Sequence, residues 1–265
     1  MIAVLFALLV LQQPETMSLL EKPLYAPPLA REERRTREAA LSAARAAHER
    51  DPASVDAALA RARAEMSLGR VGNALETVTR ALEVTPDDPR LALERGRGLI
   101  VIRKFELAAK ELRKPAETLP EASCALGMAR YLAADYPHAR EAFARCKGQD
   151  ISPVFVYLAD WRTGASAMPR PVVSREPEPD PSAAIRLPGA AKKPGPTMRI
   201  PLTAIYLDAA ERLIDGDTAA AQGLLKQIVE KNRNSWMDPV YIAAEVDYAK
   251  ILETEGKRQK AKRKK

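Results

Sequence analysis

Small and apolar residues recur at helical spacing along most of the chain, and glycine or proline interrupts them at regular intervals. The stretch from Val55 to Asp88 has one helical pattern, a break at Leu68–Val71, a second helical pattern and a loop at Pro86. The glycine in the break is suited to end the first helix, and Pro86 stops the second. Small residues such as Ala74 and Ala81 let the two helices approach closely. The pattern therefore predicts a helical hairpin of 34 residues.

The same spacing starts again at Pro89, with two departures. Gly96 is the small residue in the middle of the first helix, and Phe105 is the aromatic residue that follows the turn. Arg103 stands where the first unit has its turn glycine, and Pro115 falls where a small residue is expected. Because proline cannot continue a helix, we expect the second helix to end early and this unit to shorten to about 31 residues.

A third unit begins at Pro120, and partial units flank the three. Its positions in register are Leu126, Gly127, Ala129, Tyr136, Ala139, Phe143 and Cys146. Residues 40–52 match the second helix of an earlier unit whose first helix is degenerate, as is common at the ends of repeat arrays. The apolar stretch Ser152–Arg162 supplies a further helix that closes the array.

The composition changes at residues 165–200, where eight prolines lie among acidic, alanine and glycine residues. Such a segment cannot bury enough surface to fold, which predicts a disordered, partly extended linker. After it, Pro201 starts another helical hairpin with a turn at Asp215–Asp217. A further helix is predicted from Asp238 to Glu255, ending at Gly256.

The recurring unit resembles the tetratricopeptide repeat, and its degenerate pattern recurs about five times, roughly over residues 36–162 and 201–261. The resemblance implies an all-α fold, an α-solenoid of helix-turn-helix repeats interrupted by the Pro-rich linker. We therefore divide the chain into an N-terminal array (31–164), the linker (165–200), C-terminal repeat-like helices (201–256) and a basic tail (257–265).

The resemblance also implies a binding surface, because the first helices of successive repeats in this family line a concave groove for peptides or partner helices. The positions of this chain that match are Leu59, Arg63, Met66, Leu93, Arg97, Ile100, Met128 and Tyr131. Apolar side chains alternate there with arginines, which suits an extended or helical protein ligand with hydrophobic and acidic residues. The alternative is that the apolar members belong to the core between repeats and the arginines are simply solvated.

The net charge of +7 comes from the end of the chain, because seven of the last nine residues are lysine or arginine and the rest sums to zero. Three interpretations of the tail 257–265 stay open: a frayed helix end, a contact with anionic lipid or an acidic partner, and nucleic-acid binding. The tail has no interleaved aromatic residues for base stacking, which makes nucleic acid the least favoured partner.

The N-terminus has an uninterrupted apolar run, Ile2–Leu11. Ten residues are too few to span a bilayer, which needs roughly 20. Residues 1–19 fit a signal peptide better, although no Lys or Arg precedes the run and no clear cleavage site follows. We expect an exported protein of the bacterial periplasm or cell envelope. The alternatives are an uncleaved anchor, a helix that docks on the repeats, or a start at Met17, and without a signal the chain is cytoplasmic.

Residues able to carry catalysis are few. The two histidines, His48 and His138, fall on predicted second helices of different units, and no His/Cys cluster has metal-binding spacing. Gly96–Gly98 lies inside a helix and does not follow a strand, unlike a phosphate-binding loop. The acidic residues at 176–180 alternate with prolines and cannot easily converge on one ion. We expect a non-catalytic interaction scaffold without a cofactor.

Two cysteines lie at opposite ends of the third hairpin, Cys124 early on its first helix and Cys146 late on its second. In an exported protein they could form a disulfide, which would stabilise the hairpin by roughly 3 kcal/mol. Both could equally be buried small residues, since Cys146 fills a position where alanine is usual.

Overall fold

The computed structural model describes residues 13–146, 153–165, 169–172, 178–179, 198–199 and 201–262. The helices of its N-terminal part are α1 (Arg31–Arg50), α2 (Val55–Ser67), α3 (Val71–Val84), α4 (Pro89–Val101), α5 (Phe105–Leu112), α6 (Pro120–Leu132), α7 (Tyr136–Arg145) and α8 (Pro153–Arg162). Those of its C-terminal unit are α9 (Leu202–Ile214), α10 (Thr218–Lys231) and α11 (Pro239–Lys262). Two 3₁₀ helices, η1 (Pro115–Glu117) and η3 (Arg233–Ser235), and two pairs of two-residue strands complete the described elements.

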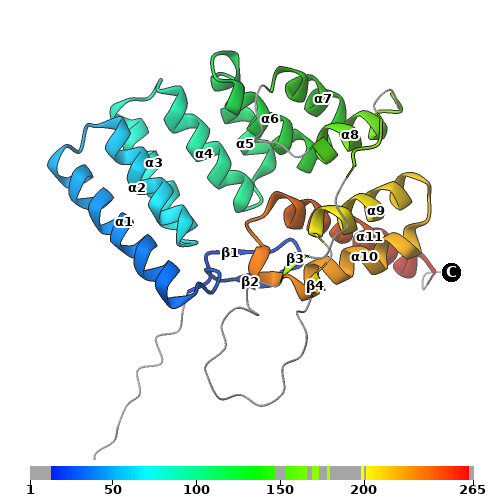
Figure 1. Ribbon diagram of the computed structural model, residues 1–265. Coiled ribbons are helices and arrows are strands. Elements are labelled where there is room, and N and C mark those ends of the chain that lie inside the picture. Colours follow the sequence, from blue (N-terminus) through cyan, green and yellow to red (C-terminus); the bar gives the residue numbers. More distant parts are fainter. Residues whose placement is uncertain are drawn as a thin grey trace, which may run out of the picture.

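Consecutive helices pack against one another, and the predicted all-α solenoid is confirmed. Helices α1 to α8 form an arc, and α9 to α11 lie beneath its C-terminal end (Figure 1). The antiparallel pair of β1 (Thr16–Met17) and β2 (Pro23–Leu24) lies between the arc and the C-terminal unit. A second short pair joins β3 (Glu178–Pro179) to β4 (Met198–Arg199).

Five helices end in the same left-handed turn, which sets the repeat. The second residue after each helix has a positive φ: Gly69 (72°), Arg103 (65°), Ala134 (64°), Gly164 (77°) and Gly216 (86°). In each turn the next backbone amide donates to a carbonyl five residues back, as from Arg70 to Glu65 at 2.9 Å. This bond closes the helix end because it satisfies a carbonyl that has no partner within the helix.

Two glycines allow the paired helices to touch. A Cβ at Gly96 would lie 2.5 Å from Leu112 of α5, and a Cβ at Gly127 would overlap the ring of Phe143 on α7. The early end of α5 at Leu112 also agrees with the sequence, because Pro115 starts the 3₁₀ helix η1 instead of continuing α5.

One predicted helix boundary differs in the structure, and one predicted segment is described only in part. The helix expected to end at Gly256 continues as α11 to Lys262, because a glycine near an exposed helix end costs only about 1 kcal/mol relative to alanine. Of the predicted signal segment 1–19, residues 1–12 lie outside the described residues, and Thr16–Met17 forms β1.

The linker predicted at 165–200 is described only at 165, 169–172, 178–179 and 198–199. There Arg170 binds α9, with its Nε 2.6 Å from Oε1 of Glu211. The linker separates two helical parts along the sequence, and the structure packs these parts together around one core cluster that includes residues from Leu24 to Ile251. The two parts touch where α8 contacts α9 and where α6 contacts α11.

Candidate partner-binding site

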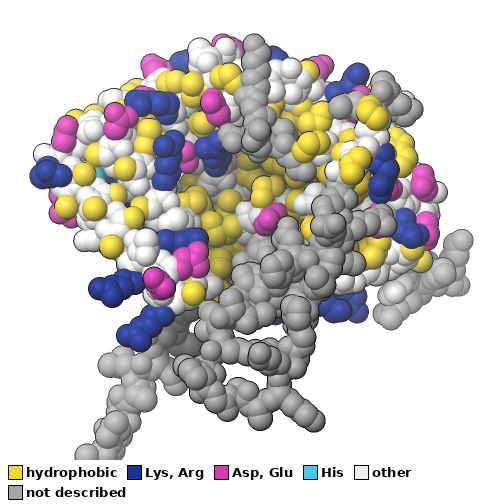
Figure 2. All heavy atoms as spheres, viewed as in Figure 1, with side chains coloured by type: hydrophobic (Ala, Val, Ile, Leu, Met, Phe, Trp, Pro, Cys, Tyr) yellow, Lys and Arg dark blue, Asp and Glu magenta, His cyan; other side chains and the backbone are white. Residues whose placement is uncertain are grey.

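The concave side of the arc is hollowed (Figure 2). Figure 2 shows that its visible floor is largely hydrophobic, with Lys and Arg side chains on the side of the arc. Arg63 of α2 and Arg97 of α4 both contact Glu94, at 2.8 and 3.3 Å, and their side chains are 59% and 39% exposed. These two predicted groove residues are therefore accessible at the surface.

The apolar residues predicted for the groove divide into two groups. Leu59 packs in a core cluster shared by α2 and α3, and Leu93 is buried in the main core. Ile100 and Met128 are mostly buried but line a pocket between α4, α6 and α11. The remaining member of α2, Met66, is partly buried and packs against both cores.

Tyr131 differs from the prediction, because the C-terminal unit covers it. Its hydroxyl lies 2.9 Å from that of Tyr206 on α9, and Tyr206 donates at 3.0 Å to Oδ2 of Asp247 on α11. Burial raises the pKa of both tyrosines above the ordinary value, so both are protonated near neutral pH. Tyr131 is thus part of an internal interface and not an open binding surface.

The same interface contains a buried ion pair between α8 and α11. Arg162 donates to Asp247 through Nη1 at 3.1 Å and Nη2 at 2.5 Å, and its guanidinium stacks on the rings of Tyr131 and Tyr136. Burial alone lowers the pKa of Arg162, but Tyr131 and Asp247 outweigh it and hold this pKa well above its usual value. Arg162 therefore remains charged, and this buried charge needs the Asp247 carboxylate as its partner.

A second buried ion pair joins the repeat turn after α4 to α11. Arg103 donates to Oε2 of Glu245 through Nε at 3.1 Å and Nη2 at 2.6 Å, and both side chains are almost fully buried. The backbone amide of Leu19 donates to the other oxygen of Glu245 at 2.6 Å. Beside them, Trp236 donates its indole N–H to the carbonyl oxygen of Tyr25 at 2.7 Å. The N-terminal hairpin, the arc and α11 thus meet at one buried carboxylate.

The pocket between α4, α6 and α11, which we call the junction pocket, has a volume of about 220 Å³. Its apolar lining includes Ile100, Cys124, Ala125, Met128, Met237 and Ile242. Arg97 and Glu121 supply its charged groups. Both the arc and the C-terminal unit contribute to it, so it exists only while the two are docked.

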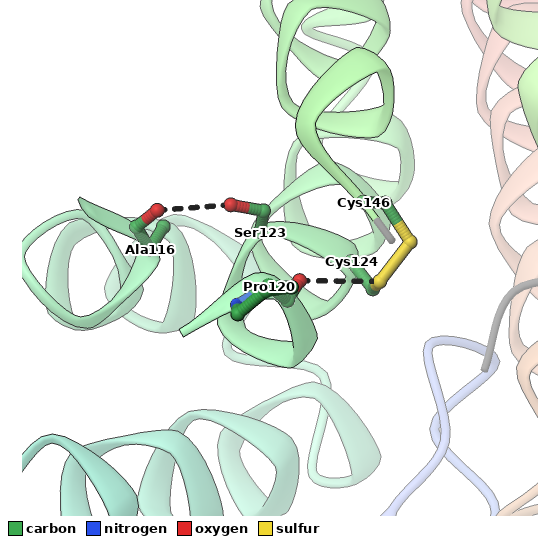
Figure 3. Close-up of a disulfide and its surroundings, with 5 residues drawn as sticks. All are labelled: Ala116, Pro120, Ser123, Cys124 and Cys146. Carbon is green, nitrogen blue, oxygen red and sulfur yellow. Dashed lines mark hydrogen bonds between the residues drawn. A yellow bond between two sulfur atoms is a disulfide. The ribbon is translucent and has the colours of Figure 1, made fainter. Parts of the chain in front are cut away.

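Cys124 and Cys146 form a disulfide at one wall of this pocket, with their Cα atoms 4.7 Å apart (Figure 3). The bond ties the start of α6 to the residue that follows α7. On the opposite side of α6, the hydroxyl of Ser123 donates to the carbonyl of Ala116 at 2.9 Å and fixes α6 to η1. The wall of the pocket is therefore held covalently and by a buried hydrogen bond.

Metal-binding groupings do not emerge in the part of the chain that the structure describes. No three His, Cys, Asp or Glu side chains there converge on one point. His138 lies exposed on α7, with Nδ1 2.7 Å from Oδ1 of Asp135. Among the described helices none has the length and apolar character needed to cross a membrane.

Sequence reasoning missed the contribution of α11, although the sequence carries a signal for it. Glu245 and Asp247 interrupt the apolar stretch Val240–Ile251, and a charge within a stretch that is buried elsewhere indicates a buried partner. Nothing in the sequence identifies Arg103 and Arg162 as those partners, because they lie 142 and 85 residues away.

Comparison with known proteins supports the repeat assignment. A family model described as tetratricopeptide repeat matches residues 30–95. A search of curated proteins and a search of solved structures each found no match. The match covers α1 to α3 and the first half of α4, and the left-handed turns after α4 and α6 continue the same geometry. Residues 30–95 therefore match the tetratricopeptide repeat, a repeat that suggests a protein–protein interaction scaffold and is generally non-catalytic.

Proposed function

We propose that this protein is a non-catalytic scaffold that holds a peptide or helix of a partner protein in its concave hollow. The observation that carries the proposal is the concave hollow, whose visible floor is largely hydrophobic (Figure 2). The exposed Arg63 and Arg97, which both contact Glu94, supply positive charge on the predicted groove helices. Repeat arrays commonly bind on such a concave surface.

The internal contacts of the chain suggest the chemistry of that partner. Where α11 docks on the arc, buried arginines hold its carboxylates, Arg103 with Glu245 and Arg162 with Asp247, among apolar side chains. Charge-assisted pairs of this kind are stronger than neutral hydrogen bonds. A partner segment with apolar residues and carboxylates would repeat this chemistry on the open part of the same face.

We also propose that the protein is exported to the bacterial periplasm or cell envelope. The apolar run Ile2–Leu11 and the Cys124–Cys146 disulfide support this, because disulfides persist in oxidising compartments. The second candidate is a membrane-anchored scaffold that keeps the apolar run. Intact mass spectrometry of the protein from its native host distinguishes them: a loss within residues 1–14 supports export with cleavage, and a full-length chain in the membrane fraction supports the anchor.

The hollow is tested by reversing its exposed charges. Immobilised protein carrying Arg63→Glu and Arg97→Glu should lose partners that the unaltered protein captures from its host. The matched control is Arg80→Glu, on the outer helix α3, where the arginine is also exposed and also contacts a glutamate. Equal capture by both variants and the unaltered protein, with unchanged thermal unfolding, would show that the hollow is not the binding surface.

A further inference from the structure

Resting on the proposed function, we infer that the junction pocket is the anchor site of the partner and takes one bulky apolar side chain that has a carboxylate beside it. The pocket is apolar over most of its lining and continues the interface at which α11 already docks. Ile242 of α11 and Met128 of α6 both line it, so both parts of the chain form the site.

The size of the pocket favours a side chain over a small molecule. At about 220 Å³ it is smaller than the roughly 300–1,000 Å³ of usual small-molecule sites. In protein interfaces, one aromatic or aliphatic residue inserted into a well-packed pocket commonly dominates the affinity. Leucine, phenylalanine and tryptophan have the shape and apolar surface for such an anchor.

Two charges at the pocket orient the anchored segment. Arg97 contacts Glu94, and its side chain is 39% exposed, so it places a positive charge at the pocket that attracts a carboxylate. Glu121, from the first turn of α6, would repel the same carboxylate. A partner segment therefore binds with its acidic residue toward α4 and not toward α6.

The disulfide gives the pocket a fixed wall. Cys124 lines the pocket, and its bond to Cys146 prevents the start of α6 from separating from the end of α7. A preformed pocket loses less conformational entropy when a side chain enters, which favours binding.

The test uses peptides selected from a random 12-residue display library on the full-length, oxidised protein. The selected peptides should share one large apolar residue with Asp or Glu close to it. Replacing that apolar residue by alanine should weaken binding at least ten-fold, measured by fluorescence anisotropy. Replacing the acidic residue by lysine should weaken binding to the unaltered protein and have less effect on the Arg97→Glu variant.

Two protein variants test the pocket itself. Ala125→Phe fills the pocket from α6 and should weaken binding at least ten-fold, whereas Ala43→Phe, at an exposed position of α1, should not. Met237→Ala enlarges the pocket from the turn that precedes α11, where Met237 is partly exposed, and should shift preference toward tryptophan over leucine. This second variant keeps the test decisive if Ala125→Phe lowers the melting temperature.

The outcomes separate the anchor site from the function. Peptides that lose binding to the Arg63→Glu, Arg97→Glu protein but bind the Ala125→Phe and Met237→Ala proteins unchanged would overturn the anchor site and leave the scaffold proposal standing. Failure to select any peptide would count against both. Decanoate binding that Ala125→Phe abolishes, without peptide binding, would identify an acyl chain as the occupant and overturn the inference.

Discussion

Glu245→Gln removes the charge that joins the C-terminal unit to the rest of the molecule and changes little in shape. The Glu245 carboxylate is fully buried and accepts hydrogen bonds from Nε and Nη2 of Arg103 and from the amide of Leu19. A glutamine would present an NH₂ group to at least one of these donors. The guanidinium of Arg103, whose side chain is only 3% exposed, would then remain charged without its carboxylate.

The expected cost is large because a buried charge loses its partner. Breaking a buried ion pair from one side typically costs about 3–5 kcal/mol, which is a major part of the roughly 5–15 kcal/mol of a folded domain. Glu253→Gln is the matched control on the same helix. Glu253 forms an ion pair with Lys257 at 2.6 Å, but both side chains are mostly exposed, so no measurable change is expected.

Urea unfolding followed by tryptophan fluorescence and by circular dichroism measures the effect. Trp236 is buried beside Arg103 and reports on the interface, and circular dichroism reports on all helices. Glu245→Gln should lower the fluorescence midpoint, and the double variant Arg103→Met, Glu245→Leu should recover part of the loss because it leaves no unpaired charge. A Glu245→Gln protein within 1 kcal/mol of the unaltered one would refute the view that this ion pair holds the units together.

Three further predictions concern stability. Gly127→Ala should lower the free energy of unfolding by about 1–3 kcal/mol, because the ring of Phe143 on α7 occupies the space of the added methyl group. Gly223→Ala has no atom within 4 Å of the added methyl group and should raise the free energy of unfolding by about 0.5–1 kcal/mol. Urea titrations that rank the two variants the other way would contradict this. Replacing Cys124 and Cys146 by alanine should cost about 3 kcal/mol for a sequence separation of 22 residues, and two free thiols in the unreduced denatured protein would exclude the bond. Because burial raises the pKa of Tyr206 above its ordinary value of 10.0, the unfolded chain loses this proton first. Stability should therefore fall as the pH rises above 10, by up to about 1.4 kcal/mol per pH unit, and urea midpoints that stay constant from pH 9 to 11 would contradict it.

The solenoid could be predicted from the sequence because its determinants are local. Gly69 and Gly216 mark turns whose hydrogen bonds span only five residues, and Gly96 and Gly127 mark contacts between helices of one hairpin. Even the short α5 follows from one proline, Pro115. Each of these features acts within about one repeat, so the spacing of residue types is sufficient to reveal it.

The open and covered parts of the concave face could not be predicted, because α9 and α11 determine them from a distance in sequence. Tyr131 occupies a groove position of its repeat, and only the docking of Tyr206 and Asp247 makes it internal. For the same reason the junction pocket was not foreseen, since Met237 and Ile242 form one side of it. The family resemblance describes a repeat and contains no information about a second unit packed on the array.

The turn after α4 shows how such a distant contact alters a local rule. Both Arg103 and Ala134 have a left-handed backbone, which costs a residue with a side chain roughly 1–2 kcal/mol and glycine almost nothing. At Ala134 no contact of the side chain explains the departure from glycine. At Arg103 the guanidinium pairs with the buried Glu245, and leaving that carboxylate without its partner would cost about 3–5 kcal/mol, more than the backbone conformation does. A degenerate turn position in this repeat can therefore mark the place where another part of the chain docks.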